Sequence, residues 1–463
     1  HTSSPLGRVA LGGKREIEQA LDAAEKRFTA WSTTTPQIRA EYGFKFAKKL
    51  VEQQHDFAAL ICLEMGKPPR EAYADVAEAI DFCNYYATQM IELARPKHTQ
   101  RLAGERNVSH YRPRGPMVAI NPFNFFAIAV GQSVAPLIAG NTVITKPSLD
   151  NPLCLAKFVQ LTRECDLPVG VLNYVVCEDK DAHHLTESSK IHKVLFTGSV
   201  TVGTSIYETV AKRSPTQTHL RSAICEMGGK NAIIIDDDAD IDRAVQGTLY
   251  SAFGYAGQKC SANSRTIIHA YVYDLFVEKM IEATRSLRVG NAGDLTTDIG
   301  PLINHTSFIK TTSLIDEAIR ARAKPVHLGM RFGNAGYYVG PTILEITPDN
   351  PLANQEIFGP VLGVMKARDF NHALDLFNGV SFALTGGLYS RTPSHMTRFE
   401  QEAQAGNLYL NRGITGAIVQ RQPFGGFRMS GSGPKAGGPN YLPSLMHEIH
   451  IATNTERSGY FGD

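Results

Sequence analysis

Short apolar runs alternate with helix-compatible stretches from residue 117 onward, and this alternation constrains the fold more than any other feature. Strands buried on both faces of a parallel sheet read as unbroken apolar runs, and the helices between them cover the sheet. The pattern therefore predicts a parallel sheet that binds nucleotides at the carboxyl ends of its strands. The predicted strands are 117–120, 142–145, 172–176, 193–196 and 232–235, with helices at 126–139, 151–164 and 201–213.

A second alternating set begins near residue 240 and predicts a second α/β lobe. It contains apolar runs at 265–269, 386–390 and 406–411, and a predicted helix at 271–286. Upstream, apolar residues at helical spacing predict one helix that includes Ile17, Leu21 and Trp31, and another over 70–92. A chain of 463 residues is long enough for two or three hydrophobic cores.

Two segments outside these sets alternate with a period of two, which is typical of strands. They are 105–115 and 446–457. We expect them to pair as an outlying sheet, whose exposed edge invites a strand from another subunit. The pattern therefore predicts at least a homodimer.

Composition argues against several classes of partner. Lys and Arg number 47 against 45 Asp and Glu, and no basic run occurs, so neither nucleic acid nor a membrane surface is expected. The apolar stretch 125–140 contains Gln132, Ser133 and Pro136 and is too short for a bilayer span, so it predicts a buried helix. We expect a small-molecule partner.

Cysteine usage points to a reducing compartment. The seven cysteines are odd in number and include no CxxC pair, which argues against both a disulfide framework and a zinc site. We expect no metal, and a cytoplasmic location (mitochondrial matrix if the source is eukaryotic).

Three residues follow predicted strands or turns and have side chains suited to acyl chemistry. Cys260, in GQKCSANSR, is either a nucleophile or an inert buried thiol. Glu226, before Gly-Gly, is either a base acting on water or a turn cap. Asn124 is either an oxyanion donor or a turn residue. Each motif alone leaves both interpretations open.

Further motifs suit a nucleotide. Lys146, at a strand end, is placed to bind ribose hydroxyls, and Gly198 with Ser199 precedes a predicted helix whose N-terminus favours an anion. Glu356 is able to accept from a ribose and Phe358 to pack on a flat ring, although a loop with a buried aromatic explains QEIFGP equally well.

Six motifs occur in one order along the chain, and together they resemble the aldehyde dehydrogenase superfamily from about residue 5 to 457. They are NPFNFF, GNTVITKPS, FTGSVTVG, CEMGGKNA, GQKCSA and QEIFGP. The resemblance implies an α/β fold with a Rossmann-type parallel-sheet domain, a second α/β catalytic domain and a small β oligomerisation element. The implied boundaries are 1–96 and 114–229 for the NAD-binding domain, 230–434 for the catalytic thiol domain, and 97–113 and 435–463 for the oligomerisation strands.

The resemblance also implies a mechanism. The Cys260 thiolate attacks an aldehyde, the Cys260 backbone amide and Asn124 hold the oxyanion, and Glu226 activates the water that releases the acid. NAD is the implied cofactor, with NADP possible because Leu149 stands where many family members carry an acid. The implied cofactor contacts are Ile120, Asn121, Pro122, Lys146, Ser148, Gly198, Ser199, Met227, Glu356 and Phe358.

A narrower resemblance concerns the loop 411–442, which is similar to that of the Δ1-pyrroline-5-carboxylate dehydrogenase branch, whose substrate is glutamate γ-semialdehyde. It implies that Ser261, Gly416 and Ala417 bind the substrate α-carboxylate, that Phe125 and Phe424 flank its chain, and that Glu78 meets the α-ammonium group. Succinate or 2-aminoadipate semialdehyde would fit the same loop nearly as well. A catalytically silent binding protein is a third reading, against which Cys260, Glu226 and Asn124 are all present.

Overall fold

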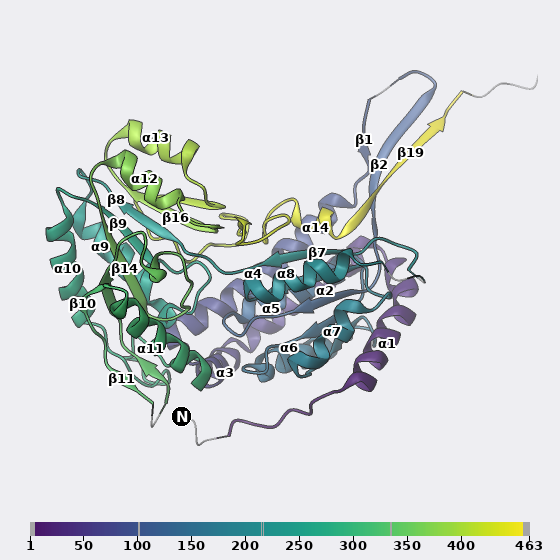
Figure 1. Cartoon of the computed structure of the whole chain (residues 1–463). Coiled ribbons are helices and arrows are strands. Elements are labelled where there is room, and N and C mark those ends of the chain that lie inside the picture. Colours follow the sequence, from purple (N-terminus) through teal and green to yellow (C-terminus); the bar gives the residue numbers. More distant parts are fainter. Residues whose placement is uncertain (1–4, 101, 214, 216, 334–335, 457–463) are drawn as a thin grey trace, which may run out of the picture.

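Two α/β lobes and a projecting antiparallel sheet make up the chain in a computed structural model (Figure 1). The structure describes residues 5–100, 102–213, 215, 217–333 and 336–456. Positions 1–4 and 457–463, at the ends of the predicted first and last segments, lie outside the described residues. The predicted α/β class is confirmed.

The first lobe is built on a five-stranded parallel sheet in the order β5-β4-β3-β6-β7. The chain enters at β3, adds β4 and β5 on one side, and then adds β6 and β7 on the other. The switch point between β3 and β6 is where such sheets bind nucleotides. The strands are β3 (Met117–Ile120), β4 (Val143–Lys146), β5 (Leu172–Tyr174), β6 (Lys193–Thr197) and β7 (Ser222–Glu226).

Two details of this sheet differ from the sequence prediction. The run 232–235 was grouped with the first sheet, but it forms β8 (Ala232–Ile235) in the second lobe. Its place at the edge of the first sheet is taken by β7, which was not predicted because Ser222 and Glu226 interrupt its apolar character. Pattern alone does not say which sheet a buried parallel strand joins.

Helices cover this sheet, and their ends follow ordinary capping rules. The Thr35 side chain accepts a hydrogen bond from the Ile38 amide at the start of α2, and Gly66, with φ of 69°, ends α3. The α5 helix is buried along nearly its whole length, as predicted for 125–140. The helices are α1 (Lys14–Ser32), α2 (Pro36–Glu52), α3 (Gln54–Met65), α4 (Pro69–Leu93), α5 (Phe126–Ile138), α6 (Pro152–Glu164), α7 (Asp179–Glu187) and α8 (Val200–Ala211). Within the described ranges, no helix combines the length and apolar character needed to cross a membrane.

The second lobe contains a seven-stranded sheet in the order β10-β13-β14-β9-β8-β16-β17, parallel except for the edge strand β10. Its strands are β8, β9 (Arg265–His269), β10 (Lys324–His327), β13 (Thr342–Glu345), β14 (Val361–Ala367), β16 (Thr385–Tyr389) and β17 (Asn407–Leu410). Its helices are α9 (Ile241–Phe253), η1 (Gly254–Gly257), α10 (Tyr273–Arg285), α11 (His305–Arg320), η2 (Pro351–Ala353), α12 (Phe370–Asn378) and α13 (Pro393–Glu402). Short pairs β11 (Arg331–Phe332) with β12 (Tyr338–Val339), and β15 (Phe382–Ala383) with β18 (Phe427–Arg428), complete it.

The two outlying segments pair as predicted and form the sheet that we call the flap. It consists of β1 (Lys97–His98), β2 (Glu105–Pro113) and β19 (Met446–Asn454), with Met446 opposite Pro113 and Asn454 opposite Glu105. The flap projects from the body, and the short helix α14 (Tyr441–Ser444) lies at its root (Figure 1). Its part in oligomerisation stays a prediction.

Candidate active site

Cys260 lies in the segment that consists of η1 and the loop from η1 to β9. We call this segment the thiol loop (residues 254–264). Cys260 is half-buried there. Just before it, Tyr255 and Ala256 both have φ of 52°, a left-handed conformation that is uncommon for residues other than glycine. Such backbone strain costs about 1–3 kcal/mol per residue and persists only where the surrounding structure enforces it. The contacts that enforce it come from two sides.

On one side, Glu71 of α4 holds the thiol loop. Its Oε1 accepts a hydrogen bond from the Tyr255 amide at 2.8 Å, and its Oε2 lies 2.7 Å from Lys259 Nζ. Both side chains are largely buried, at 12% and 6% exposed, so this ion pair is shielded from solvent. Charge-assisted hydrogen bonds of this kind are shorter and stronger than neutral ones. Glu71 therefore anchors the strained segment that leads to Cys260.

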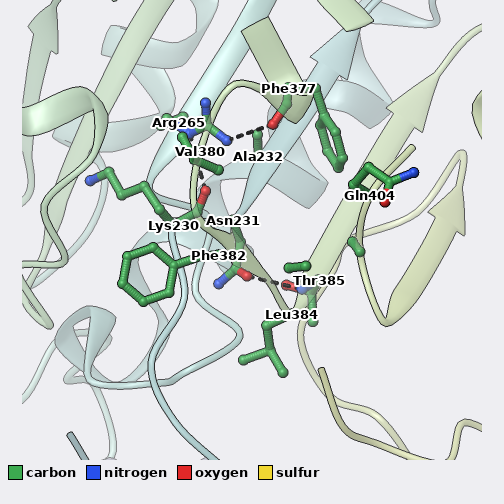
Figure 2. A pocket seen from close by; sticks show the side chains of 12 residues that line it. Lys230, Asn231, Ala232, Arg265, Phe377, Val380, Phe382, Leu384, Thr385 and Gln404 are labelled. Atoms are coloured by element: carbon green, nitrogen blue, oxygen red, sulfur yellow. Dashed lines mark hydrogen bonds between the residues drawn. The ribbon is translucent and has the colours of Figure 1, made fainter. Parts of the chain in front are cut away.

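On the other side, Asn231 joins the thiol loop to the sheet of the second lobe. Its Nδ2 donates to the carbonyl oxygens of Cys260 and Ala262 at 2.7 and 2.9 Å, and its Oδ1 accepts from the Thr385 amide at 2.9 Å. Figure 2 shows Asn231 and Thr385 joined in this way, near Arg265. Sequence reasoning missed Asn231, because an Asn between Gly-Gly and a strand looks like an ordinary turn residue.

We expect Asn231→Ala to lower both stability and turnover. The substitution removes the donor for two carbonyls, and each buried group left without a partner costs about 1–3 kcal/mol. Thermal unfolding and steady-state rates measure the two effects. Asn173→Ala serves as the control, since that half-buried Asn bonds backbone carbonyls far from the thiol. An Asn231→Ala variant that loses stability and yet keeps full kcat would contradict a positioning role for this side chain.

The electrostatic environment keeps the Cys260 thiol protonated. Burial, and then the nearby Glu226 and Glu356 carboxyl groups, raise the pKa of Cys260 to about 12, while the backbone amides of Ser261 and Cys260 act in the opposite direction. At neutral pH the thiol therefore needs a proton acceptor, or a positive charge brought beside it, before it attacks a carbonyl.

Glu226 ends β7 and is a buried carboxyl group without fixed partners. Neither carboxylate oxygen forms a hydrogen bond with another side chain in the described part of the chain, and the Gly426 backbone is the group that acts on it most closely. Burial raises the pKa of Glu226 well above its usual value, and the Gly426 backbone and Lys435 only partly oppose this. A methyl group on Gly425 would come within 2.9 Å of Glu226 Oε1, so the side chain lies against the C-terminal segment. A buried carboxyl group with a raised pKa is suited to acting as a general base.

Asn124 meets the thiol loop from the first lobe. It is buried, and its Nδ2 donates to the Gln258 carbonyl at 2.9 Å, which leaves its second N–H proton free for another acceptor. The Cys260 amide likewise donates no hydrogen bond to a described group. These two donors are the predicted oxyanion pair, and each has a hydrogen to offer.

Asp75 fixes the start of α5, directly after Asn124. Its two oxygens accept from the Phe126 and Ala127 amides at 3.1 and 2.8 Å, and Oδ2 lies 2.6 Å from Lys67 Nζ. Both members of this ion pair are buried. The Lys67 ammonium also lies 3.8 Å from the centre of the Phe125 ring, a cation–π contact. The segment that presents Asn124 and Phe125 is thus held as firmly as the thiol loop.

Glu71, Asp75 and Glu78 share one face of α4, because residues three and four apart in a helix lie above one another. The first anchors the thiol loop and the second anchors α5, whereas Glu78 forms no hydrogen bond with any described residue. Burial first, and then the charge of Asp75, raise the pKa of Glu78 to about 8. A cation beside Glu78 would stabilise the charged form of this carboxyl group and lower its pKa. Sequence reasoning identified only Glu78, although the acidic spacing was visible.

The residues predicted to bind a cofactor lie along one edge of the five-stranded sheet, because its parallel strands all end there. The Ser199 hydroxyl caps α8 by accepting from the Val202 amide at 3.4 Å. The exposed start of this helix is a position suited to a phosphate group. At this edge lie Ile120, Asn121, Pro122, Lys146, Ser148, Gly198, Ser199 and Met227.

Some of these side chains already have protein partners. The buried Lys146 Nζ lies 3.2 Å from the exposed Asp179 Oδ1, and Asn121 Nδ2 bonds to Thr145 Oγ1 at 2.8 Å, which joins β3 to β4. Because Asp179 is exposed, a ligand hydroxyl is able to replace it beside Lys146 Nζ. Asn121 keeps its Oδ1 without a partner in the described structure.

The side of the site opposite the sheet edge is formed by residues 355–360 (QEIFGP). Glu356 Oε1 accepts from the Gly229 amide at 2.9 Å, and this carboxylate fits only because Gly228 has no side chain. Phe358, with φ of 63°, packs edge-on against Phe123 with 5.7 Å between ring centres. The Gly228-Gly229 pair thus brings Glu356 beside the end of β7.

The predicted carboxylate-binding turn has free donors. The Gly416 and Ala417 amides form no hydrogen bond with described groups, and open space surrounds Gly416, whose φ is 76°. Ser251 ties this turn to the thiol loop: its Oγ accepts from the Ile414 amide at 3.0 Å and its carbonyl from the Asn263 amide at 2.9 Å. The other predicted substrate residues are Ser261, which is buried, and Phe125 and Phe424, which are half-buried.

Comparison with known proteins gives consistent results. The profile of the aldehyde dehydrogenase family matches residues 1–450. 1-Pyrroline-5-carboxylate dehydrogenase 2 of Bacillus subtilis (strain 168) is 44% identical over 450 residues, which cover 96% of this chain and 87% of the relative. A crystal structure of 1-pyrroline-5-carboxylate dehydrogenase from Thermus with bound NAD has a TM-score of 0.93 at 39% identity, covering 96% of this chain and 87% of that one.

A longer protein has the same fold over part of its length. Proline utilization A from Bdellovibrio bacteriovorus has a TM-score of 0.95 at 40% identity. The match covers 97% of this chain but 47% of that one, so this chain spans about half of the longer protein.

Proposed function

Since the chain belongs to the aldehyde dehydrogenase family, we propose that it oxidises glutamate γ-semialdehyde, the open form of Δ1-pyrroline-5-carboxylate, to glutamate. The choice of substrate is supported by two kinds of group without hydrogen bonds to described residues: the Gly416 and Ala417 amides, and the Glu78 carboxyl. This substrate has both an α-carboxylate and an α-ammonium group, and the first suits the backbone amides while the second suits Glu78. Phe125 and Phe424 would flank the carbon chain between them.

In the proposed reaction, the Cys260 sulfur forms a bond to the aldehyde carbon, and the thiol proton leaves to a neighbouring carboxyl group or to water. The carbonyl oxygen becomes an oxyanion, which the Cys260 amide and the second N–H of Asn124 stabilise. Because the thiol loop is pinned by Glu71 and Asn231, the sulfur and these donors keep fixed relative positions.

NAD, when bound, would be the oxidant: it would accept a hydride from the thiohemiacetal, which would become a thioester. Glu226 then takes a proton from water as the water attacks the thioester carbon, and the carbon–sulfur bond breaks to release glutamate and the thiol. A carboxylate with a raised pKa is a suitable base for this step, because it binds a proton from water more strongly than an ordinary carboxylate does.

The residues at the sheet edge fit a dinucleotide. The start of α8, with Gly198 and Ser199, would hold the pyrophosphate, and Lys146 and Glu356 would bind the ribose hydroxyls. Ile120, Asn121, Pro122, Ser148, Met227 and Phe358 would line the rest. Leu149 is exposed and uncharged, so its side chain does not repel a 2′-phosphate, and we propose NADP as a second cofactor. We also propose the domain limits given above, and a homodimer or larger assembly formed through the flap.

The direct test is NADH formation with Δ1-pyrroline-5-carboxylate, succinate semialdehyde and a simple aliphatic aldehyde. We expect the highest kcat/KM with the first. Glu78→Gln should lower kcat/KM for Δ1-pyrroline-5-carboxylate about tenfold or more, a loss on the scale of one charged hydrogen bond, and leave succinate semialdehyde nearly unaffected, because that substrate has no ammonium group. Equal rates with succinate semialdehyde, or an equal loss for both substrates, would overturn the substrate assignment while leaving the thiol chemistry intact.

A further inference from the structure

Basic side chains gather at the root of the flap, on the side of the first lobe opposite the cofactor edge. Lys193 is the first residue of β6 and His192 precedes it, so both lie at the amino ends of the parallel strands. Arg114, which follows β2, and His447, in β19, face them from the flap root. The His192 ring stacks on the His219 ring with 3.5 Å between centres and 3° between planes. We call these five residues the basic cluster.

No acidic group balances the basic cluster within the described structure. Burial, and then His219, His447 and Arg114, lower the pKa of His192 to about 4. Burial, and then Arg114, lower the pKa of Lys193 to about 8. Every charged group that acts on these two is therefore basic. A buried ammonium next to a guanidinium, with no counter-charge, is unfavourable unless an anion joins them.

Lys193 is the centre of the cluster and lacks a partner. It is 7% exposed, and its ammonium forms no hydrogen bond or ion pair with a described residue. Ser222 lies beside it, since Lys193 and Ser222 are in register in neighbouring parallel strands and their side chains leave the same face of the sheet. The Ser222 hydroxyl is also buried without a partner. The Lys193 ammonium and the Ser222 hydroxyl are thus neighbouring groups without a partner in the described structure.

Other donors at the same place are only partly used. Arg114 Nε donates to the Met446 carbonyl at 3.0 Å, while its two terminal nitrogens form no hydrogen bond with a described group. His219 Nε2 donates to the Ile191 carbonyl at 3.1 Å, which holds the stacked rings in place. Gly115 makes room for them, because a methyl group there would come within 2.2 Å of His192 Cδ2. The cluster is a fixed arrangement built on backbone contacts.

From this arrangement we propose a binding site for a phosphate-class oxyanion, formed by Lys193 and Ser222 with Arg114 and His447 at its mouth. An ammonium, a hydroxyl, a guanidinium and an imidazole are the donors that tetrahedral oxyanions prefer. The site is separate from the proposed catalytic function, because it lies at the amino ends of the strands whose carboxyl ends carry the cofactor residues. A phosphate bound there would join the flap to the first lobe.

The experiment is a thermal-unfolding titration with inorganic phosphate at pH 7, at constant ionic strength set with chloride. Saturating NAD is present throughout, so that its own phosphate site is filled. We expect the midpoint of wild type to rise by about 1–2 °C when phosphate reaches ten times its Kd. Lys193→Gln should lose this rise. Lys26→Gln, which removes an exposed lysine of α1, should keep it.

His447→Gln provides a second variant in case Lys193→Gln fails to fold, since His447 is exposed and its replacement leaves the core intact. It should weaken the phosphate response at least threefold in apparent Kd, measured by the same titration. A wild-type midpoint that responds equally to phosphate and to chloride would overturn the proposal. So would an unchanged phosphate response in both Lys193→Gln and His447→Gln.

Discussion

Cys260→Ala should abolish dehydrogenase turnover, with a loss of roughly 10³-fold or more, while NAD binding changes little. The sulfur is the only group in the proposed mechanism that bonds to substrate, so no other side chain replaces it. The residues proposed to bind NAD lie on the sheet edge and depend on other contacts, which the substitution leaves in place. NADH formation measures the first effect, and titration of protein fluorescence with NAD measures the second.

Cys62→Ala is the matched control for this prediction. Cys62 is also a half-buried free thiol, but it lies in α3, away from the thiol loop. We expect this variant to keep wild-type turnover. If Cys260→Ala retained more than about a tenth of the wild-type rate, a difference of only ~1.4 kcal/mol in barrier height, covalent catalysis by this thiol would be refuted. Parallel loss of NAD affinity and activity would indicate misfolding instead, which circular dichroism would reveal.

Glu226→Gln should produce the second-largest effect, a fall in steady-state turnover of about 10²–10⁴-fold. Because the base acts only after oxidation, the first turnover should still proceed, and rapid mixing should show a burst of NADH equal to the number of active sites. The amide is nearly isosteric with the carboxyl group and leaves the fold intact.

The pH dependence gives an independent check on Glu226. Burial raises the pKa of this carboxyl group, and the base must be ionised to accept a proton, so wild-type kcat should rise as pH increases through the raised pKa. The residual rate of Glu226→Gln should lack that rise. A Glu226→Gln variant without a burst would show that Glu226 acts before or during hydride transfer. An unchanged pH profile would show that another group is the titrating base.

The sequence predicted the fold well where apolar periodicity is unbroken. The strands from 117 to 197, the helices α5, α6 and α8, and the pairing of the flap strands follow from the apolar period, whereas α7 (Asp179–Glu187) was not predicted. It failed at β7 and at 232–235, because which sheet a buried strand joins is decided by long-range packing. Ser222 and Glu226 also break the apolar pattern of β7, and they lie beside Lys193 of the basic cluster and in the candidate active site, respectively.

The sequence predicted the reactive residues of the candidate site, but it did not predict the residues that hold them in position. Cys260, Glu226 and Asn124 are reactive types in recognisable motifs, so sequence reasoning finds them. Glu71 and Asn231 act through backbone groups of residues far away in sequence, at 2.8 and 2.7 Å, and no local pattern reveals such contacts. Because Glu71 and Asn231 hold the thiol loop, the position of the thiol depends on residues that only the structure reveals.

Trapping the thioester is the most direct test of whether Cys260 carries the acyl group of the substrate. Glu226→Gln is mixed with NAD and Δ1-pyrroline-5-carboxylate and quenched in acid, which keeps the α-amino group protonated and unable to attack the thioester. Peptide mass spectrometry then locates the adduct. We expect one glutamyl group on the peptide that contains Cys260. An unmodified Cys260, or the same adduct on another residue, would contradict it.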